Sequence, residues 1–183
     1  MRIAILGNSG SGKSTLAGQL ANRFDLQAVD LDTFAWEPGR IAVPRDTAAA
    51  EADLARFCLA RDQWVIEGCY ANLIRVTLTF APVLVFLQPG AATCLAHCRT
   101  RPWEPHKYAS QAEQDGKLAF LLEWVQAYYT RDGDLSLAAH QALFNGYGGP
   151  KHQLTEPPSE AFLTGFGAAG RLSGYPSTQE AES

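Results

Sequence analysis

The sequence predicts an α/β fold with a parallel sheet. The first observation is that short apolar runs, typical of buried strands, alternate with segments whose apolar residues recur at helical spacing. The second is a glycine-rich stretch that directly follows the first apolar run and precedes an amphipathic helix beginning at Lys13. The third is the length of 183 residues with 46% apolar residues, which fits one domain with a sizeable core.

Each element is expected from such a local signal. Strands are expected at residues 2–6, 27–31, 64–67 and 83–87, with a weaker fifth strand at 151–155. Helices are expected at residues 13–24, 44–60, 71–75, 91–99, 117–129, 135–144 and 159–166. Residues 33–43 and 101–116 contain proline and glycine, so they are expected to be irregular, and the second is expected to act as a lid. One domain is expected over residues 1–169, followed by a flexible tail over residues 170–183.

Composition and charge argue against several classes of partner. The net charge is −4 and no run of Lys or Arg is present, so nucleic acid is not an expected partner. No apolar stretch reaches the roughly 18 residues of a membrane span, and no signal-peptide pattern is visible. The cysteines form no CxxC pair and are interpreted as reduced thiols. We therefore expect a cytoplasmic protein that acts on a small molecule; the sequence carries no signal for its oligomeric state.

The glycine-rich stretch fits the phosphate-binding pattern G-x-x-x-x-G-K-[ST], the Walker A motif. Its residues are Gly7, Asn8, Ser9, Gly10, Ser11, Gly12, Lys13, Ser14 and Thr15. Glycine permits positive φ, so backbone N–H groups turn towards phosphate oxygens, and the N-terminus of the following helix favours the same anion. Lys13 is expected to reach the β- and γ-phosphates, and the Ser14 hydroxyl to bind Mg²⁺. The motif predicts binding of ATP with Mg²⁺.

Acidic residues at the ends of predicted strands form a second candidate group. Glu67 ends the third strand and is assigned to the Mg²⁺ site through water, because ligands collect at the carboxyl ends of parallel strands. Asp32 follows the second strand and is expected to orient the acceptor or to accept its proton. Asp30 lies two residues earlier, on the same side of an extended strand. Each of these carboxylates could instead be an ordinary solvated side chain.

Cations near the predicted lid form the third group. Arg99 and Arg101 lie where a predicted helix enters the proline-containing segment, and His106 and Lys107 lie within that segment. Arginine matches the geometry of phosphate oxygens, and closure of a lid would bring these cations to the migrating phosphoryl group. Lys13, Asp32, Arg99 and Arg101 are thus the candidate catalytic residues. The alternative is a solvated loop with ordinary charges.

Three segments together resemble the adenylate-kinase-related P-loop kinases, many of which are labelled DNA topology modulation protein. They are residues 7–15, then Val29-Asp30-Leu31-Asp32 with Trp36 and Pro38-Gly39, then Trp64-Val65-Ile66-Glu67-Gly68 with Tyr70. The resemblance implies a P-loop NTPase three-layer sandwich with a five-stranded parallel sheet, similar to nucleoside-monophosphate kinases. It also implies an acceptor region after the second strand and a lid after the helix that follows the fourth strand. Relatives usually have Asp-Gly at Glu67-Gly68 and a lid richer in arginine.

The sequence therefore predicts an ATP-dependent phosphotransferase. The γ-phosphoryl group would pass to a small-molecule acceptor, which the sequence leaves open as a nucleotide, a nucleoside or a hydroxylated metabolite. The alternative is a nucleotide-binding regulatory protein or slow NTPase without a small acceptor, which the arginine-poor lid favours. No guanine-recognition signature is present, and the acidic composition gives no support to DNA binding.

Overall fold

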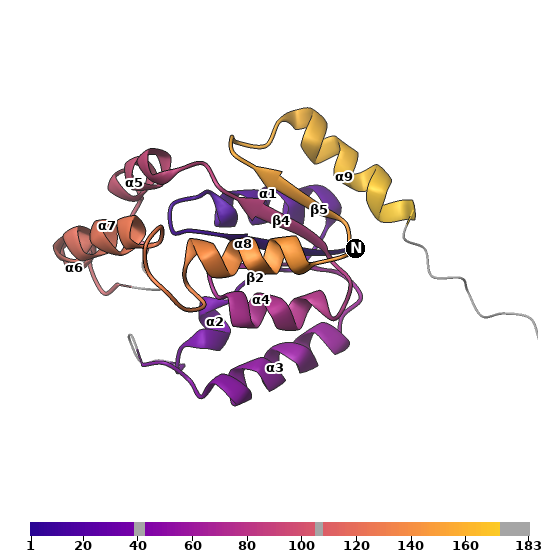
Figure 1. Ribbon diagram of the computed structural model, residues 1–183, viewed down its shortest axis with the longest axis horizontal. Helices are drawn as coiled ribbons and strands as arrows, with labels where there is room; N and C mark the ends of the chain where they lie inside the picture. Colours follow the sequence, from indigo (N-terminus) through magenta and orange to yellow (C-terminus); the bar gives the residue numbers. More distant parts are fainter. Residues whose placement is uncertain (39–42, 105–107, 173–183) are drawn as a thin grey trace, which may run out of the picture.

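The computed structural model describes residues 1–38, 43–104 and 108–172. Five strands form one parallel sheet in the order β2-β3-β1-β4-β5, which confirms the predicted fold class (Figure 1). The strands are β1 (Arg2–Gly7), β2 (Ala28–Asp30), β3 (Trp64–Gly68), β4 (Val83–Leu87) and β5 (Lys151–Leu154). None of the helices in the described ranges combines the length and apolar content that crossing a bilayer requires.

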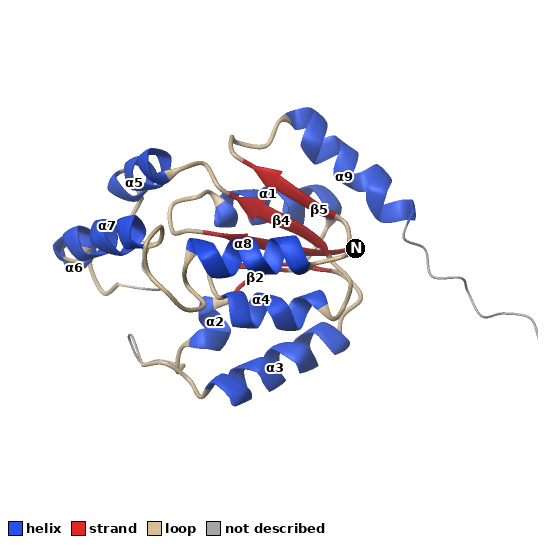
Figure 2. Cartoon of the chain, in the orientation of Figure 1, coloured by secondary structure: helices blue, strands red, loops and turns tan. Residues whose placement is uncertain are grey.

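Helices cover both faces of the sheet, so the molecule has three layers (Figure 2). They are α1 (Lys13–Phe24), α2 (Asp32–Ala35), α3 (Thr47–Leu59), α4 (Ala71–Leu78), α5 (Ala91–Arg99), α6 (Gln111–Gly116), α7 (Leu118–Ala127), α8 (Leu137–Gly146) and α9 (Glu160–Leu172).

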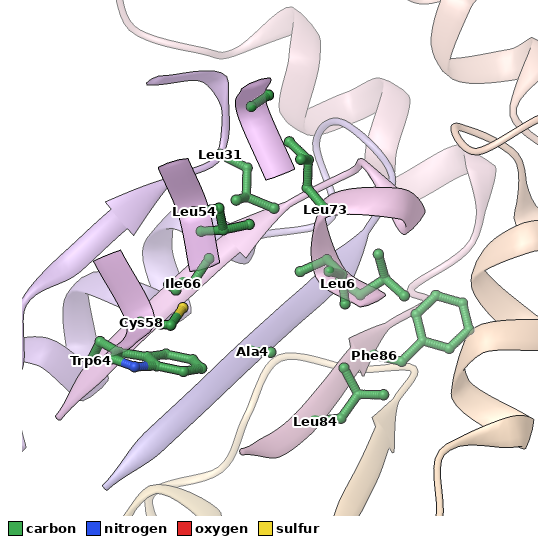
Figure 3. Packing of buried hydrophobic residues seen from close by; sticks show 12 residues of the cluster. Ala4, Leu6, Leu31, Leu54, Cys58, Trp64, Ile66, Leu73, Leu84 and Phe86 are labelled. Carbon is green, nitrogen blue, oxygen red and sulfur yellow. The ribbon is translucent and has the colours of Figure 1, made fainter. Parts of the chain in front are cut away.

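The alternation of side chains along β1 explains the two layers of helices. Ile3 and Ile5 point to the face covered by α1 and α9, whereas Ala4 and Leu6 point to the face covered by α3, α4 and α8. Figure 3 shows the second core, in which side chains of three neighbouring strands meet those of α3 and α4. Its buried members are Ala4, Leu6, Leu31, Ala50, Leu54, Cys58, Trp64, Ile66, Leu73, Ile74, Leu84 and Phe86. Both cores fix the strand ends on which the candidate site is built.

A third, smaller cluster lies beyond the carboxyl ends of the strands. Cys94 and Cys98 of α5 pack there against Val125 of α7, and Figure 1 places these helices with α6 beyond the arrowheads of the sheet. All cysteines are free, and burial raises the pKa of Cys94 and of Cys58 to about 11. The interpretation of the cysteines as packed, reduced thiols agrees with this geometry.

Two segments that were expected to be irregular contain short helices, and these predictions were wrong. The helix α2 begins at Asp32 and extends into the segment 33–43, which was predicted to be a loop, and α6 lies within the predicted lid. The cause at α6 is local: Ser110 caps the helix by accepting from Glu113 N at 3.1 Å, and Glu113 accepts in turn from Ala109 N at 3.0 Å. The Ser-x-x-Glu spacing of a capping box is visible in the sequence and predicts such a helix start.

Helix boundaries also differ from the expectation. The third helix begins at Thr47 rather than Pro44, because Asp46 caps it by accepting from Ala49 N at 2.9 Å. Pro44 instead forms an antiparallel bridge with Trp36. The last helix continues to Leu172, past the expected start of the tail at residue 170, and residues 173–183 lie outside the described ranges. The division into one domain and a tail stays a prediction.

Candidate active site

The predicted phosphate loop joins β1 to α1 and presses against α5. The chain leaves β1 at Gly7, and α1 begins at Lys13 directly after Gly12. Gly10 has a φ of 76°, and a Cβ there would lie 2.3 Å from the carbonyl oxygen of Cys94. Because no side chain fits into that distance and positive φ disfavours every other residue, this position requires glycine. The loop is thereby held at the N-terminus of α1, where helices bind anions.

Hydrogen bonds with α5 and α7 fix the shape of the loop. Asn8 donates from Nδ2 to the Val125 carbonyl of α7 at 3.0 Å and accepts from Ser9 N at 2.8 Å. His97 Nδ1 lies 2.8 Å from the Gly10 carbonyl oxygen, to which it donates. The roles of His97 and Val125 were missed, since no local sequence pattern connects them with the loop.

The loop also holds polar groups that suit a phosphate ligand. Lys13 Nζ donates to the Asn8 carbonyl at 2.9 Å, so the ammonium group lies over the loop. Ser11 is buried, and its hydroxyl has no hydrogen-bond partner among the described residues. A buried hydroxyl without a partner costs free energy, which a bound anion would offset. The geometry therefore fits the predicted cradle for nucleotide phosphates.

Ser14 and Glu67 meet directly beside the loop. Glu67 alternates with Ile66 along β3, so its side chain points towards the start of α1. Ser14 donates to Glu67 Oε1 at 2.5 Å. Glu67 is buried, with 4% of its surface exposed; burial raises its pKa, while Lys13 acts in the opposite direction. The sequence prediction that these two residues share a site agrees with this contact.

The Ser14–Glu67 pair fits Mg²⁺ in donor chemistry. A hydroxyl and a carboxylate oxygen are hard ligands, and Mg²⁺ in P-loop proteins takes its remaining ligands from water and nucleotide phosphates. Over the described residues, no group of three His, Cys, Asp or Glu side chains could hold a metal by itself. The pair thus suits a cation that arrives with a nucleotide rather than a permanently bound metal.

Asp30, Asp32 and Tyr70 line the neighbouring strand ends. Asp30 is in register with Glu67, and its Oδ1 accepts from Asp32 N at 2.9 Å. Asp32 accepts at Oδ1 from the Tyr70 hydroxyl at 2.7 Å. Both aspartates raise the pKa of Glu67, so the three carboxylates lie close together. Tyr70 had been noted only as part of the resemblance; its partner lies 38 positions away, so spacing alone could not assign it.

Of the predicted lid cations, the structure describes Arg99 and Arg101. Arg101 is half-buried and pairs with Glu104 at 3.0 Å. Burial raises the pKa of the Cys98 thiol, which lies against the phosphate loop, while Arg101 and Lys13 act in the opposite direction. Arg99 is exposed in the last turn of α5 and lines a cavity of about 30 Å³ with Arg101. The structure thus brings Arg101 close to the loop. His106 and Lys107 lie outside the described residues.

Comparison with known proteins extends the agreement in fold. No protein-family model matches the chain, and no curated protein sequence matches it. Among solved structures, a sugar kinase from Janibacter is similar over 94% of this chain and 95% of its own, with 19% identity and a TM-score of 0.53. A shikimate kinase from Aquifex aeolicus is similar over 95% of this chain and 100% of its own, with 18% identity and a TM-score of 0.51.

A nucleotide-bound structure belongs to the same group. YorR protein from Bacillus subtilis, solved in complex with phosphorylated GDP, is similar over 94% of this chain and 96% of its own, with 12% identity and a TM-score of 0.54. At such identities the likeness establishes the fold alone: the chain has the sheet order and layers of P-loop small-molecule kinases. The finer resemblance to the adenylate-kinase-related family stays a prediction.

Proposed function

We propose that this chain is a P-loop kinase that transfers the γ-phosphoryl group of Mg-ATP to a small-molecule acceptor. The observation that carries the proposal is the convergence of two pairs at the carboxyl ends of β2 and β3. Ser14–Glu67 lies beside the phosphate loop, and Asp32–Tyr70 lies next to it on the side of β2. A site of this kind places a metal-nucleotide subsite next to a carboxylate that faces a second substrate.

Each residue then has a defined task. The loop N–H groups and Lys13 would bind the β- and γ-phosphates; Ser14, with Glu67 acting through water, would hold Mg²⁺, which would neutralise charge on the phosphates. Asp32, oriented by Tyr70, receives the proton of the acceptor hydroxyl. The acceptor oxygen forms a bond to the γ-phosphorus, the bond from that phosphorus to the β–γ bridging oxygen breaks, and ADP leaves. Arg101 stabilises the migrating group once closure separates it from Glu104.

The acceptor belongs to the classes that such folds accommodate. The sugar kinase and the shikimate kinase that share the fold are named for small hydroxylated acceptors, whereas YorR is described with a phosphorylated nucleotide. These names support a small acceptor but do not select among a nucleotide, a nucleoside and a hydroxylated metabolite, because fold does not fix substrate.

A coupled ADP-release assay with Mg-ATP tests the proposal against a panel of nucleoside monophosphates, nucleosides, polyols and hydroxy acids. We expect strong stimulation by one acceptor class and its loss in Lys13→Met. Lys117→Met serves as a matched control, because Lys117 pairs with Glu113 at the surface. Undiminished transfer by Lys13→Met would refute the proposal.

A nucleotide-binding regulator or slow NTPase is the second candidate, and the Arg101–Glu104 pair favours it. An arginine already paired with a carboxylate is less available to a transferring phosphoryl group. Intact ATP binding with slow ADP release that no acceptor raises would support this candidate over the kinase.

A further inference from the structure

Arg131 follows α7 and has buried N–H groups without partners. Its guanidinium stacks on Trp124, with Cζ 3.6 Å from the ring centroid, and Nη2 donates to the Trp124 carbonyl oxygen. Its Nε and Nη1 are buried and have no hydrogen-bond partner among the described residues. Arg131 lies outside every motif recognised in the sequence.

Such an arrangement carries a free-energy cost. Burial lowers the pKa of Arg131, yet a guanidinium keeps its charge at every physiological pH. A buried donor without an acceptor loses its hydrogen bonds to water without replacement, and the cost is larger when the donor is charged. Within the described ranges, no carboxylate forms an ion pair with Arg131 that would offset this cost. A ligand that supplies oxygen acceptors would do so.

Arg131 belongs to a segment that contacts the turn carrying Cys69 and Tyr70, beside Asp32. The connection from α7 to α8 packs against the turn after β3, where Ala71 N donates to the Asp134 carbonyl at 3.1 Å (Figure 1). In the same turn, His140 Nε2 donates to the Cys69 carbonyl at 2.8 Å. Burial raises the pKa of the Cys69 thiol to about 11; Lys13 lowers it and Asp32 raises it, so Cys69 lies near both of these residues, and it also lies near Arg131.

The guanidinium is also fixed in place before any ligand arrives. Stacking on Trp124 and the bond to its carbonyl remove side-chain freedom, so binding an anion there would lose little further entropy. The Tyr70 hydroxyl, which holds Asp32, belongs to the turn against which this segment packs. A single acceptor could therefore contact Asp32 at one end and Arg131 at the other.

We propose that Arg131 binds a carboxylate or phosphate group of the acceptor, which makes the acceptor an anion. This inference rests on the proposed kinase function and narrows its acceptor to hydroxy acids and phosphate monoesters, excluding neutral nucleosides and polyols. The N–H groups that lack partners supply the hydrogen bonds, and the stacked Trp124 keeps the guanidinium in position.

The test compares acceptors that differ only in charge: nucleoside monophosphates with their nucleosides, and hydroxy acids with their amides. Only the charged member of one pair should raise ADP release. Arg131→Gln should raise the KM for that acceptor about 10- to 100-fold, as expected for lost hydrogen bonds to a charged group, while the Kd of Mg-ATP stays unchanged. Arg131→Lys keeps the charge and should give a smaller rise in KM. It replaces the glutamine variant as the test if Arg131→Gln does not fold.

The matched control is Arg61→Gln, which removes an arginine stacked on the Phe57 ring with Cζ 4.2 Å from its centroid. It should leave the KM unchanged. Equal stimulation by a neutral acceptor, or an unchanged KM in Arg131→Gln, would overturn the proposal while leaving the kinase function intact.

A binding measurement separates the anion site from catalysis. With Mg-ADP filling the phosphate loop, millimolar malonate or inorganic phosphate should raise the Tm of the wild type and of Arg61→Gln, but not of Arg131→Gln. If both anions act in this way while no acceptor raises ADP release, the anion site stands and the kinase function fails. No Arg131-dependent rise in Tm with either anion would contradict the site itself.

Discussion

Replacing His140 with glutamine should reduce the pH dependence of stability in the acid range. His140 is fully buried in α8, with Nε2 2.8 Å from the Cys69 carbonyl oxygen and Nδ1 2.8 Å from the Tyr128 hydroxyl. Because a carbonyl oxygen only accepts, the proton sits on Nε2, and Nδ1 accepts from Tyr128. The imidazole is therefore satisfied in its neutral form and holds the turn that follows Glu67.

The size of this pH effect follows from the shifted pKa of His140. Burial lowers the pKa of His140 from 6.5 to about 4. The unfolded chain thus binds the proton more readily than the folded one, so this contribution to stability is complete above pH 6.5 and is lost as pH falls towards 4. Between about pH 7 and pH 4.5 the loss amounts to about 2.5 kcal/mol.

Urea unfolding of the wild type and of His140→Gln at about pH 7 and pH 4.5 measures this difference. Carboxylates contribute equally to both proteins, so the wild type should lose about 2.5 kcal/mol more than the variant on acidification. Tyr128→Phe is the comparison variant: burial is the largest cause of the shift, so this variant should keep most of the pH slope of the wild type while losing one hydrogen bond to the neutral imidazole. Equal losses in wild type and His140→Gln would refute the reasoning.

Other predictions concern the loop and the metal subsite. Gly10→Ala should lower the free energy of unfolding in urea, without nucleotide, clearly more than Gly12→Ala does. A Cβ at Gly10 would lie 2.3 Å from the Cys94 carbonyl oxygen, whereas nothing lies within 4 Å of a Cβ at Gly12. The positive φ costs about 1 kcal/mol in either variant, so equal losses would contradict the predicted clash at Gly10. Glu67→Gln should stabilise the nucleotide-free protein increasingly as pH rises above 4.5, because the folded chain binds the Glu67 proton more tightly than the unfolded chain does, and unfolding at several pH values measures this. The same variant should raise the Mg²⁺ concentration needed for turnover. An unchanged Mg²⁺ requirement in a Mg²⁺ titration would count against the assignment of Glu67 to the metal site. Asn8→Ala should cost about 1–2 kcal/mol of unfolding free energy and weaken Mg-ATP binding, as urea unfolding and calorimetry would show; unchanged values would mean that the bond to α7 is dispensable.

The sheet could be predicted because its signals are local. Buried strands such as β1 and β4 are continuous apolar runs, and the amphipathic α1 follows its glycine loop directly. The order of the strands does not follow from such runs, since it depends on contacts between distant segments; five parallel strands were expected from the resemblance. The short helices α2 and α6 were missed because each is too short to show an apolar stripe at helical spacing, and α6 is stabilised instead by its Ser110 cap.

The candidate site also contains residues that local sequence signals predict and residues that only tertiary contacts bring together. The phosphate loop and its lysine form a contiguous motif, and Glu67 was assigned from its place at a strand end. Tyr70, His97 and Arg131 belong to separate elements and meet the site only through the packing of α5, α7 and the turn after β3. Their contribution depends on tertiary geometry, so it required the structure.

Transfer of label from [γ-³²P]ATP tests the central claim most directly. The protein is incubated with Mg²⁺ and a pool of nucleoside monophosphates, hydroxy acids and polyols, and the products are separated by chromatography. We expect one labelled acceptor in the wild type and in Lys117→Met, and none in Lys13→Met. Label that appears only as inorganic phosphate, with ATP binding intact, would contradict a kinase.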